Sequence, residues 1–209
     1  MQRLIIKRSA LFIAIIMTAA TSLAQQQRVK MALSYNVATP VSESLRDYVS
    51  KTSLRGVQGS VLYSLNDNIR VGLQVSYNDF YQKFGRQVYK FSDGTDISAV
   101  LSNTMQNIPV LIKGEYDLTK DDSWVRPYVG LGVGVNIIHH DQFLGEFENG
   151  KYYTKAAFSG DLGLLIPLSK TSQSSFRLST SYNFSPFNEA GIKNIDTWNV
   201  QAGIAFPLK

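Results

Sequence analysis

The chain has 209 residues, of which 44% are hydrophobic and 18% charged, and its lack of cysteine excludes a disulfide framework or a lipoprotein anchor. The formal net charge is +5, but three of the 21 basic residues and none of the 16 acidic residues lie in the first 24 positions, which leaves +2 for the rest. So small a basic excess does not favour a nucleic-acid-binding protein.

Residues 1–24 have the organisation of a secretory signal peptide. Arg3, Lys7 and Arg8 precede the apolar run 11–17, and Ser22-Leu23-Ala24 carries small residues where a signal peptidase reads them. The run is about half as long as the roughly 20 residues of a membrane-spanning helix. We therefore expect cleavage after Ala24 and one domain over residues 25–209.

Eight segments of that domain alternate apolar and polar residues with a period of two, which is typical of strands with one apolar face. They are residues 31–37, 57–65, 69–77, 108–118, 125–137, 156–166, 176–184 and 198–208. No long apolar segment follows the first 24 residues, so the chain could cross a membrane only as a closed barrel, which pairs every backbone polar group. The sequence predicts an all-β fold, an eight-stranded antiparallel up-and-down transmembrane β-barrel.

The alternative is a soluble barrel with its apolar face turned inward, as in a lipocalin-like carrier. Connection lengths and the charges on the polar faces argue against it. The connections 66–68, 119–123 and 169–175 are short, whereas 40–51, 83–103, 139–151 and 185–196 are long. Outer-membrane barrels have short periplasmic turns and long extracellular loops. We therefore expect the outer membrane of a Gram-negative bacterium, with both termini periplasmic.

Two glycine-containing pairs predict projecting extracellular hairpins. Asp93-Gly94 and Asn149-Gly150 can supply the positive φ angles of type I′ turns, and strand-forming residues flank both. Counting from these turns sets Val75 opposite Ile112 and Val135 opposite Leu164, so apolar residues meet apolar residues in both hairpins. The strand that begins near residue 125 is then expected to run as far as Phe147.

Charged residues on the polar faces should fill the interior, which in an eight-stranded barrel is only wide enough for side chains. Buried charges need partners, so we expect Arg70 opposite Asp117, with Arg126 near Asp117 or Glu115. The predicted network comprises Arg70, Lys113, Glu115, Asp117, Arg126, Lys155, Asp161 and Arg177. Our preferred interpretation is a structural plug that closes the lumen, and the alternative is a gated ion path.

Two further patterns could indicate chemistry. His139, His140 and Asp141 are consecutive, and neighbours in a strand point to opposite faces, so they cannot converge on one metal without a bend. A catalytic histidine also needs a positioned nucleophile and an orienting carboxylate. Ser159 and Asp161 face inward on the next strand, without a Gly-x-Ser-x-Gly elbow. We predict no catalytic residue, no metal site and no cofactor.

The glycines at positions 130, 132 and 134 recur at every second residue of a strand and are followed by no helix, unlike a nucleotide-binding loop. We expect them to leave room for long interior side chains such as Arg126 or Lys113, or to let the wall bend. On the second projecting hairpin, aromatic residues form a candidate surface for contacts, although they could also pack across the hairpin. These residues are Phe143, Phe147, Tyr152 and Tyr153.

The segments Ile108-Pro109-Val110-Leu111-Ile112-Lys113 and Arg126-Pro127-Tyr128-Val129-Gly130-Leu131-Gly132 resemble the small outer-membrane barrels common in Bacteroidetes, which include PorT-like proteins. More broadly, the chain is similar to the OmpA/OmpX class. The resemblance implies fold and location but no shared catalytic residues. The chain ends in Phe206-Pro207-Leu208-Lys209 instead of the terminal aromatic residue usual in such barrels, and Phe206 on the lipid face could take that role.

The sequence thus favours a non-enzymatic outer-membrane barrel with a closed interior, whose surface loops serve envelope integrity, adhesion or protein contact. Two alternatives remain open: an accessory component of a secretion machine, and an outer-membrane lipid-modifying enzyme that uses His139 or His140. The expected partners are outer-membrane lipid and lipopolysaccharide, with protein partners at the cell surface or in a secretion complex. No nucleic-acid partner is expected.

Overall fold

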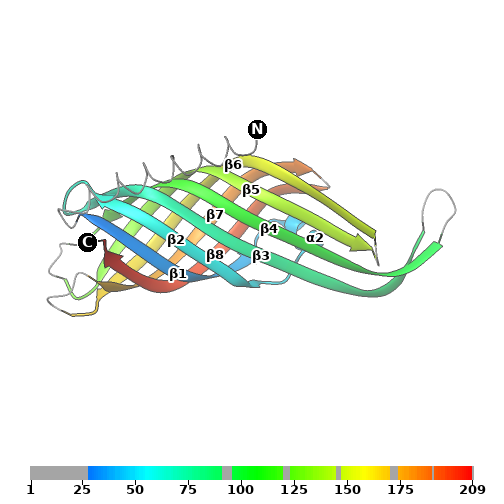
Figure 1. The fold of residues 1–209 in the computed structure, drawn as a ribbon, viewed down its shortest axis with the longest axis horizontal. Coiled ribbons are helices and arrows are strands. Elements are labelled where there is room, and N and C mark those ends of the chain that lie inside the picture. The colour runs from blue at the N-terminus through cyan, green and yellow to red at the C-terminus, as the bar shows by residue number, and fades with distance from the viewer. Residues whose placement is uncertain are drawn as a thin grey trace, which may run out of the picture.

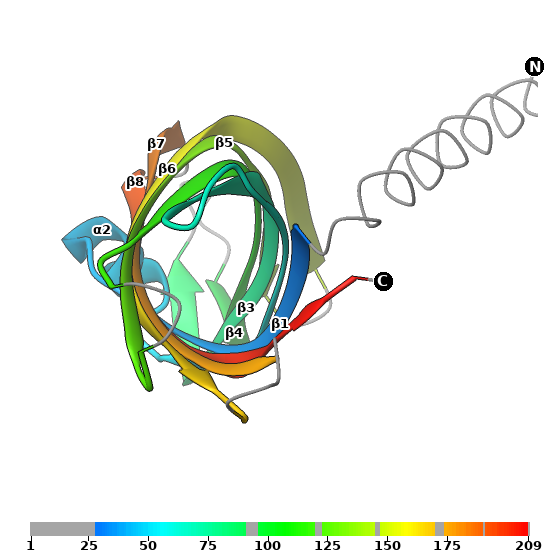
Figure 2. The same ribbon diagram turned by 90° about the vertical axis from the view of Figure 1, so that its left-hand side faces the viewer.

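The computed structural model describes residues 28–90, 96–119, 123–144, 147–169, 174–189 and 191–208; the expected signal peptide, residues 1–24, lies outside them. Within the described residues, eight antiparallel strands join in chain order into a closed barrel, in which the last strand pairs with the first (Figure 1). The view along the barrel shows this ring (Figure 2). The predicted fold class is confirmed. The strands are β1 (Val29–Pro40), β2 (Ser53–Ser64), β3 (Ile69–Lys90), β4 (Asp96–Asp117), β5 (Arg126–Leu144), β6 (Phe147–Pro167), β7 (Ser175–Glu189) and β8 (Ile192–Pro207).

The barrel wall turns its apolar residues outward, as the alternation predicts. In β5, Leu131, Val133 and Val135 are exposed, whereas Arg126 and Asn136 on the other face are buried. This division follows because successive side chains of a strand point to opposite faces. The arrangement of a soluble carrier, with the apolar face inward, is not the one found in the described strands.

The two ends of the barrel differ. The connections 65–68, 118–125 and 168–174 lie at the same end as Val29 and Pro207, and we call it the turn end. The opposite end, the hairpin end, holds the connection 41–52 and the tips of the other three hairpins. The β3–β4 hairpin projects furthest from this end (Figure 1). Its two strands remain paired as far as Lys90 and Asp96.

The predicted turn at Asn149-Gly150 is wrong. Both residues lie within β6, where Asn149 pairs with Gln142 and Gly150 with Asp141. The strands are joined instead through residues 145 and 146, so β5 ends at Leu144 and not at Phe147. Val135 consequently pairs with Ala156, eight residues from the expected Leu164.

The Asp93-Gly94 pair lies outside the described residues, but the register predicted from it can be checked and is also wrong. Val75 pairs with Val110, two residues from the expected Ile112. The five-residue connection 91–95 and a register shift between Lys83 and Arg86 account for the difference. At Val75 and Val135 both differences are even numbers of residues, so side chains there point to their predicted faces. Beyond the shift at Lys83/Arg86 the β3–β4 register differs from the predicted one by a single residue.

The connection between β1 and β2 contains a short helix that sequence analysis missed, α2 (Glu43–Tyr48). Leu45, Tyr48 and Val49 have the i, i+3, i+4 spacing of a helical apolar face, and all three are buried. Ser42 precedes the helix in extended conformation, and its hydroxyl donates a hydrogen bond to the Asn194 carbonyl at 3.1 Å. Among the described residues, no helix is long and apolar enough to cross a membrane.

Candidate functional site

The interior near the turn end is filled by a charge network centred on Glu115. This carboxylate is fully buried and accepts two hydrogen bonds from Arg177, Nη2 to Oε1 at 2.5 Å and Nη1 to Oε2 at 3.3 Å. Arg70 Nη2 lies 3.1 Å from Glu115 Oε2 and 2.5 Å from Asp117 Oδ1. Arg70 is opposite Glu115 in the sheet, so the expected pairing with Asp117 exists between side chains and not between backbone partners.

A second ion pair joins β4 to β6. Lys113 Nζ donates hydrogen bonds to the Asp161 carboxylate and to Ser159 Oγ, the latter at 3.0 Å. All three side chains are buried. A Cβ at Gly132, on the strand between them, would lie 2.5 Å from Ser159 Oγ and 3.3 Å from Lys113 Cδ. The inward glycine therefore leaves room for Lys113, as the sequence suggested.

The Tyr128 ring packs between the two arginines that contact Glu115. The ring centre lies 4.5 Å from Arg177 Cζ and 5.5 Å from Arg70 Cζ, and the side chain is buried. Such contacts between a guanidinium group and an aromatic ring are favourable, more so away from water. Gly163 is the β6 partner of Tyr128, and a Cβ there would lie 2.3 Å from the ring. Gly163 therefore makes the space that the ring occupies.

All members of the predicted network except Lys155 have buried side chains in the structure. They are Arg70, Lys113, Glu115, Asp117, Arg126, Asp161 and Arg177. Lys155 is not part of this cluster: its Nζ lies 3.5 Å from Glu189 Oε1 and faces the rings of Tyr153 and Phe187, close to the hairpin end. Alternation gives the face of a side chain but not its depth along the barrel, so it could not separate Lys155 from the other charges.

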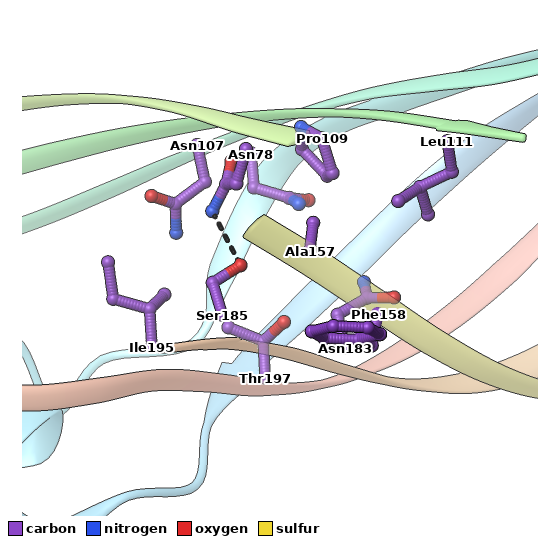
Figure 3. A pocket seen from close by; sticks show the side chains of 11 residues that line it. Asn78, Asn107, Pro109, Leu111, Ala157, Phe158, Asn183, Ser185, Ile195 and Thr197 are labelled. Carbon is purple, nitrogen blue, oxygen red and sulfur yellow. Dashed lines mark hydrogen bonds between the residues drawn. The ribbon is translucent and has the colours of Figure 1, made fainter. Parts of the chain in front are cut away.

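On the hairpin side of the charge network, asparagine and hydroxyl side chains cross the lumen, and we call them the amide belt: Asn78, Asn107, Asn136, Asn183, Ser185 and Thr197. Together with apolar neighbours such as Leu111 and Ile195 they line a cavity of about 10 Å³, room for about one water molecule (Figure 3). Asn136 Nδ2 donates a hydrogen bond to Ser185 Oγ at 3.3 Å across this space. Both polar atoms of the buried Asn107 side chain lack a protein partner. The cavity thus suits water, and a larger ligand does not fit.

The lumen at the hairpin end is filled by an apolar plug, which sequence analysis did not predict. Its members come from α2, from the strand walls and from the β7–β8 hairpin: Ala38, Leu45, Tyr48, Val49, Phe80, Met105, Ile138, Phe187, Ile192 and Ile195. The signal that could have revealed it is the helical spacing of the apolar residues after Ser42-Glu43, within the connection 40–51.

Hydrogen bonds fix α2 against the wall. Tyr48 Oη donates to the Asp141 carbonyl at 2.6 Å, and Asn103 Nδ2 donates to the Tyr48 carbonyl at 2.8 Å. The Tyr48 ring stacks on His140 with centres 4.5 Å apart. Burial, and secondarily the Asp141 carboxylate, raise the pKa of the Tyr48 hydroxyl well above its usual range. It therefore remains a hydrogen-bond donor at physiological pH.

The two histidines face different environments, as expected for neighbours in a strand. His140 points inward to Tyr48, whereas His139 stacks on Tyr152 with ring centres 3.9 Å apart. His139 Nε2 lies 2.9 Å from Asp141 Oδ1. Among the described residues, no three His, Cys, Asp or Glu side chains converge in a way that could hold a metal ion.

The four aromatic residues of the predicted contact surface do not form one exposed set. Tyr152 is 74% exposed, and Phe143 is half-buried. Tyr153 instead packs on the apolar plug, with its ring edge-on to Phe187 at 5.2 Å. The side chain of Phe147 lies outside the described residues.

Comparisons with known proteins agree with this architecture. Neisserial surface protein A aligns with 17% identity and a TM-score of 0.52, covering 86% of this chain and 96% of that one. OprG from Pseudomonas aeruginosa aligns with 16% identity and a TM-score of 0.54, covering 86% and 95%. At such identities the likeness establishes the fold alone. No curated protein matches the sequence at a significant level.

The sequence matches the model of the family described as outer membrane protein beta-barrel domain over residues 10–206, which includes nearly all of the eight strands. An outward apolar face around a polar, charged interior is the arrangement that such barrels need in lipid. The chain therefore belongs to the outer membrane protein beta-barrel domain family.

Proposed function

We propose that this protein is a closed, non-enzymatic barrel that acts through its hairpin end, which faces the outside of the cell and contacts other proteins. The observation that carries the proposal is the filling of the lumen. The Glu115 network, the amide belt and the apolar plug follow one another along the barrel, so a solute would have to displace buried ion pairs as well as α2. Function then belongs to the surface, where the hairpins project.

A non-enzymatic role is supported by the placement of the groups that could do chemistry. His140 is directed at the plug and His139 at Tyr152, on the other face of β5. Ser159 contacts Lys113 inside the barrel, far along the sheet from both histidines. A nucleophile, a base and an orienting acid do not meet at one place among these residues, as hydrolysis of a lipid would require.

The orientation can be tested with single cysteines, because the natural chain has none. Val88 at the hairpin end is 58% exposed and Trp124 at the turn end is 74% exposed. A membrane-impermeant maleimide should label Val88→Cys in intact cells, and Trp124→Cys only after the outer membrane is permeabilised. The reverse pattern would turn the proposed surface toward the periplasm.

Closure can be tested by recording from planar bilayers that contain the purified barrel. We expect no stepwise conductance. Replacing residues 43–50 with a Gly-Ser linker of equal length should also give none, because the charge network still blocks the turn end. Stepwise conductance of the natural protein would instead support an ion path through the network.

We also propose that the chain is a PorT-like member of its family. The two segments that carry this resemblance lie on neighbouring strands and meet at one pair, Lys113 with Gly132. At that contact the glycine accommodates the lysine. Exchange of both segments together with a PorT-like protein should preserve folding, whereas exchange of one alone should destabilise the barrel.

A further inference from the structure

The projecting part of β3 has a hydrogen-bonding partner on one side only. β3 pairs with β2 from Arg70 as far as Asn78, which lies opposite Gly56. On its other side it continues to pair with β4 up to Lys90. β4 is in turn held by β5 as far as Leu101 and Leu144. From Asp79 to Lys83, β3 is therefore the edge of a sheet that continues through β4 to β5, and from Arg86 to Lys90 it is one edge of the two-stranded β3–β4 hairpin.

The connection before β2 covers only the beginning of this edge. Ser53 Oγ donates a hydrogen bond to the Asp79 carbonyl at 2.6 Å, and Ser50 donates two bonds to Gln82 Oε1 through its backbone N–H at 2.6 Å and its hydroxyl at 3.0 Å. From Lys83 onward, no residue in the described part of the chain pairs with β3 on this side. The open edge runs from Lys83 to Lys90, about 26 Å at roughly 3.3 Å per residue.

Side chains along the open edge are accessible. Lys83, Gly85, Arg86, Gln87 and Val88 are all exposed. The corresponding edge of β6 is different, because the β7–β8 hairpin lies against it. Tyr153 contacts Phe187 there, and Lys155 pairs with Glu189. These contacts cover β6 at residues 153–155, so the part of β3 next to the barrel is more accessible than the corresponding part of β6.

The charge of the open edge indicates what can pair with it. Its exposed charged side chains, Lys83 and Arg86, are both basic. Arg55, which lies next to Tyr81 at the base of the edge, is paired with Asp79 at 3.1 Å. Proteins commonly place basic residues on edge strands to prevent pairing between identical edges. Two copies meeting edge to edge would bring these cations together, which disfavours a second copy of this chain. A strand that carries carboxylates would instead gain both backbone hydrogen bonds and charge pairing.

We propose that the β3 edge from Lys83 to Lys90 binds an extended acidic segment of another protein by adding it as a further strand. This inference rests on the proposed function, because it requires the hairpin end to contact proteins. Backbone hydrogen bonds supply affinity, and Lys83 and Arg86 select carboxylates at alternate positions of the incoming strand. The register shift between these two residues limits the length of strand that fits in one register.

The test uses the full barrel in lipid nanodiscs and a synthetic ten-residue peptide in which glutamate alternates with threonine and valine. Fluorescence anisotropy should detect binding that weakens as salt is added. Replacing Lys83 and Arg86 together by glutamate should raise the Kd at least about tenfold, because attraction becomes repulsion. Lys151→Glu, an exposed charge reversal on β6, is the matched control and should leave the Kd within about twofold. The peptide should also slow amide hydrogen exchange in residues 83–88.

Several results would overturn the proposal. The proposal fails if the peptide does not bind, if Lys151→Glu raises the Kd as much as the double reversal of Lys83 and Arg86, or if the peptide protects β6 from exchange instead of β3. Self-association of the barrel through β3 would also overturn it. So would a double reversal that alters binding to lipopolysaccharide-containing vesicles but not to the peptide. If Val88→Cys is labelled in intact cells but the peptide does not bind, this inference fails while the orientation stands. If Val88→Cys is labelled only after permeabilisation, the proposed function itself fails.

Discussion

Replacing Glu115 by glutamine should destabilise the barrel far more than the loss of any surface ion pair. Glutamine keeps the volume of the side chain and removes its charge. Arg70 retains its contact with Asp117 at 2.5 Å, but Arg177 loses both of its hydrogen bonds to an ionised carboxylate. The Arg177 side chain is only 2% exposed, so water cannot replace the lost partner.

The size of the effect follows from burial. Removing one partner of a buried ion pair costs about 3–5 kcal/mol, because the other charge remains out of water. The matched control is Arg55→Gln, which removes the 3.1 Å pair with Asp79 from a side chain that is 63% exposed. Such an exposed pair contributes about 0–1 kcal/mol. We therefore expect a difference of at least about 2 kcal/mol between the variants, or more than tenfold in the folding equilibrium.

Urea unfolding in lipid vesicles, followed by tryptophan fluorescence, measures both variants, and heat-modifiable gel mobility gives an independent readout. Adding Arg177→Met to Glu115→Gln should recover part of the lost stability, because the unpaired charge is then removed as well. Equal costs for Glu115→Gln and Arg55→Gln would refute the assignment of the network as a buried structural plug. So would a double variant that is less stable than the sum of the two single variants.

Three further predictions can be checked with the same preparation. Gly163→Ala should lower the urea midpoint by the equivalent of about 1–3 kcal/mol, because the added Cβ would overpack against the Tyr128 ring. Gly160→Ala should be neutral, because a Cβ there meets no atom within 4 Å. Equal effects of the two variants would contradict the packing argument. Leu131→Arg should cost about 2–4 kcal/mol in lipid and Tyr152→Arg almost nothing, although the two residues are 75% and 74% exposed, and similar costs would place both in water. Ionisation of Tyr48 can be measured as the absorbance difference at alkaline pH between the natural protein and Tyr48→Phe, and it should begin only above the ordinary pKa of 10.0. The plug then keeps this hydrogen bond below that pH and loses it as the pH rises further. Ionisation at or below 10.0 would show an exposed hydroxyl.

The sequence was sufficient for the faces of the strands and insufficient for their register. Leu131 and Gly132 were assigned to the correct sides because alternation depends only on parity. Asn149-Gly150 set a pairing that differs by eight residues from the observed one, yet apolar residues still met apolar residues. When a turn sequence sets apolar residues opposite apolar residues, the agreement therefore excludes only registers shifted by an odd number of residues. It does not select one register among those shifted by an even number.

The same limit explains what was right and wrong at the site. The facing of Glu115, Arg177 and Asp161 followed from alternation, so their presence inside the barrel could be predicted. Their partners could not, because Lys155 alternates like the others but lies at another depth. The apolar plug was missed for a different reason. α2 has only six residues and is buried by long-range contacts, which local periodicity does not report.

The pairing of β1 with β8, from Lys30 with Pro207 to Pro40 with Thr197, has a consequence for biogenesis. The first strand to leave the ribosome completes its hydrogen bonding only when the last one arrives, so no shorter intermediate of the barrel can rest in hydrocarbon without unsatisfied backbone edges. The polypeptide must then be kept unfolded until its synthesis and export are complete. Removing only the final strand should leave a species that remains in the aqueous compartment and is degraded, instead of a smaller inserted barrel.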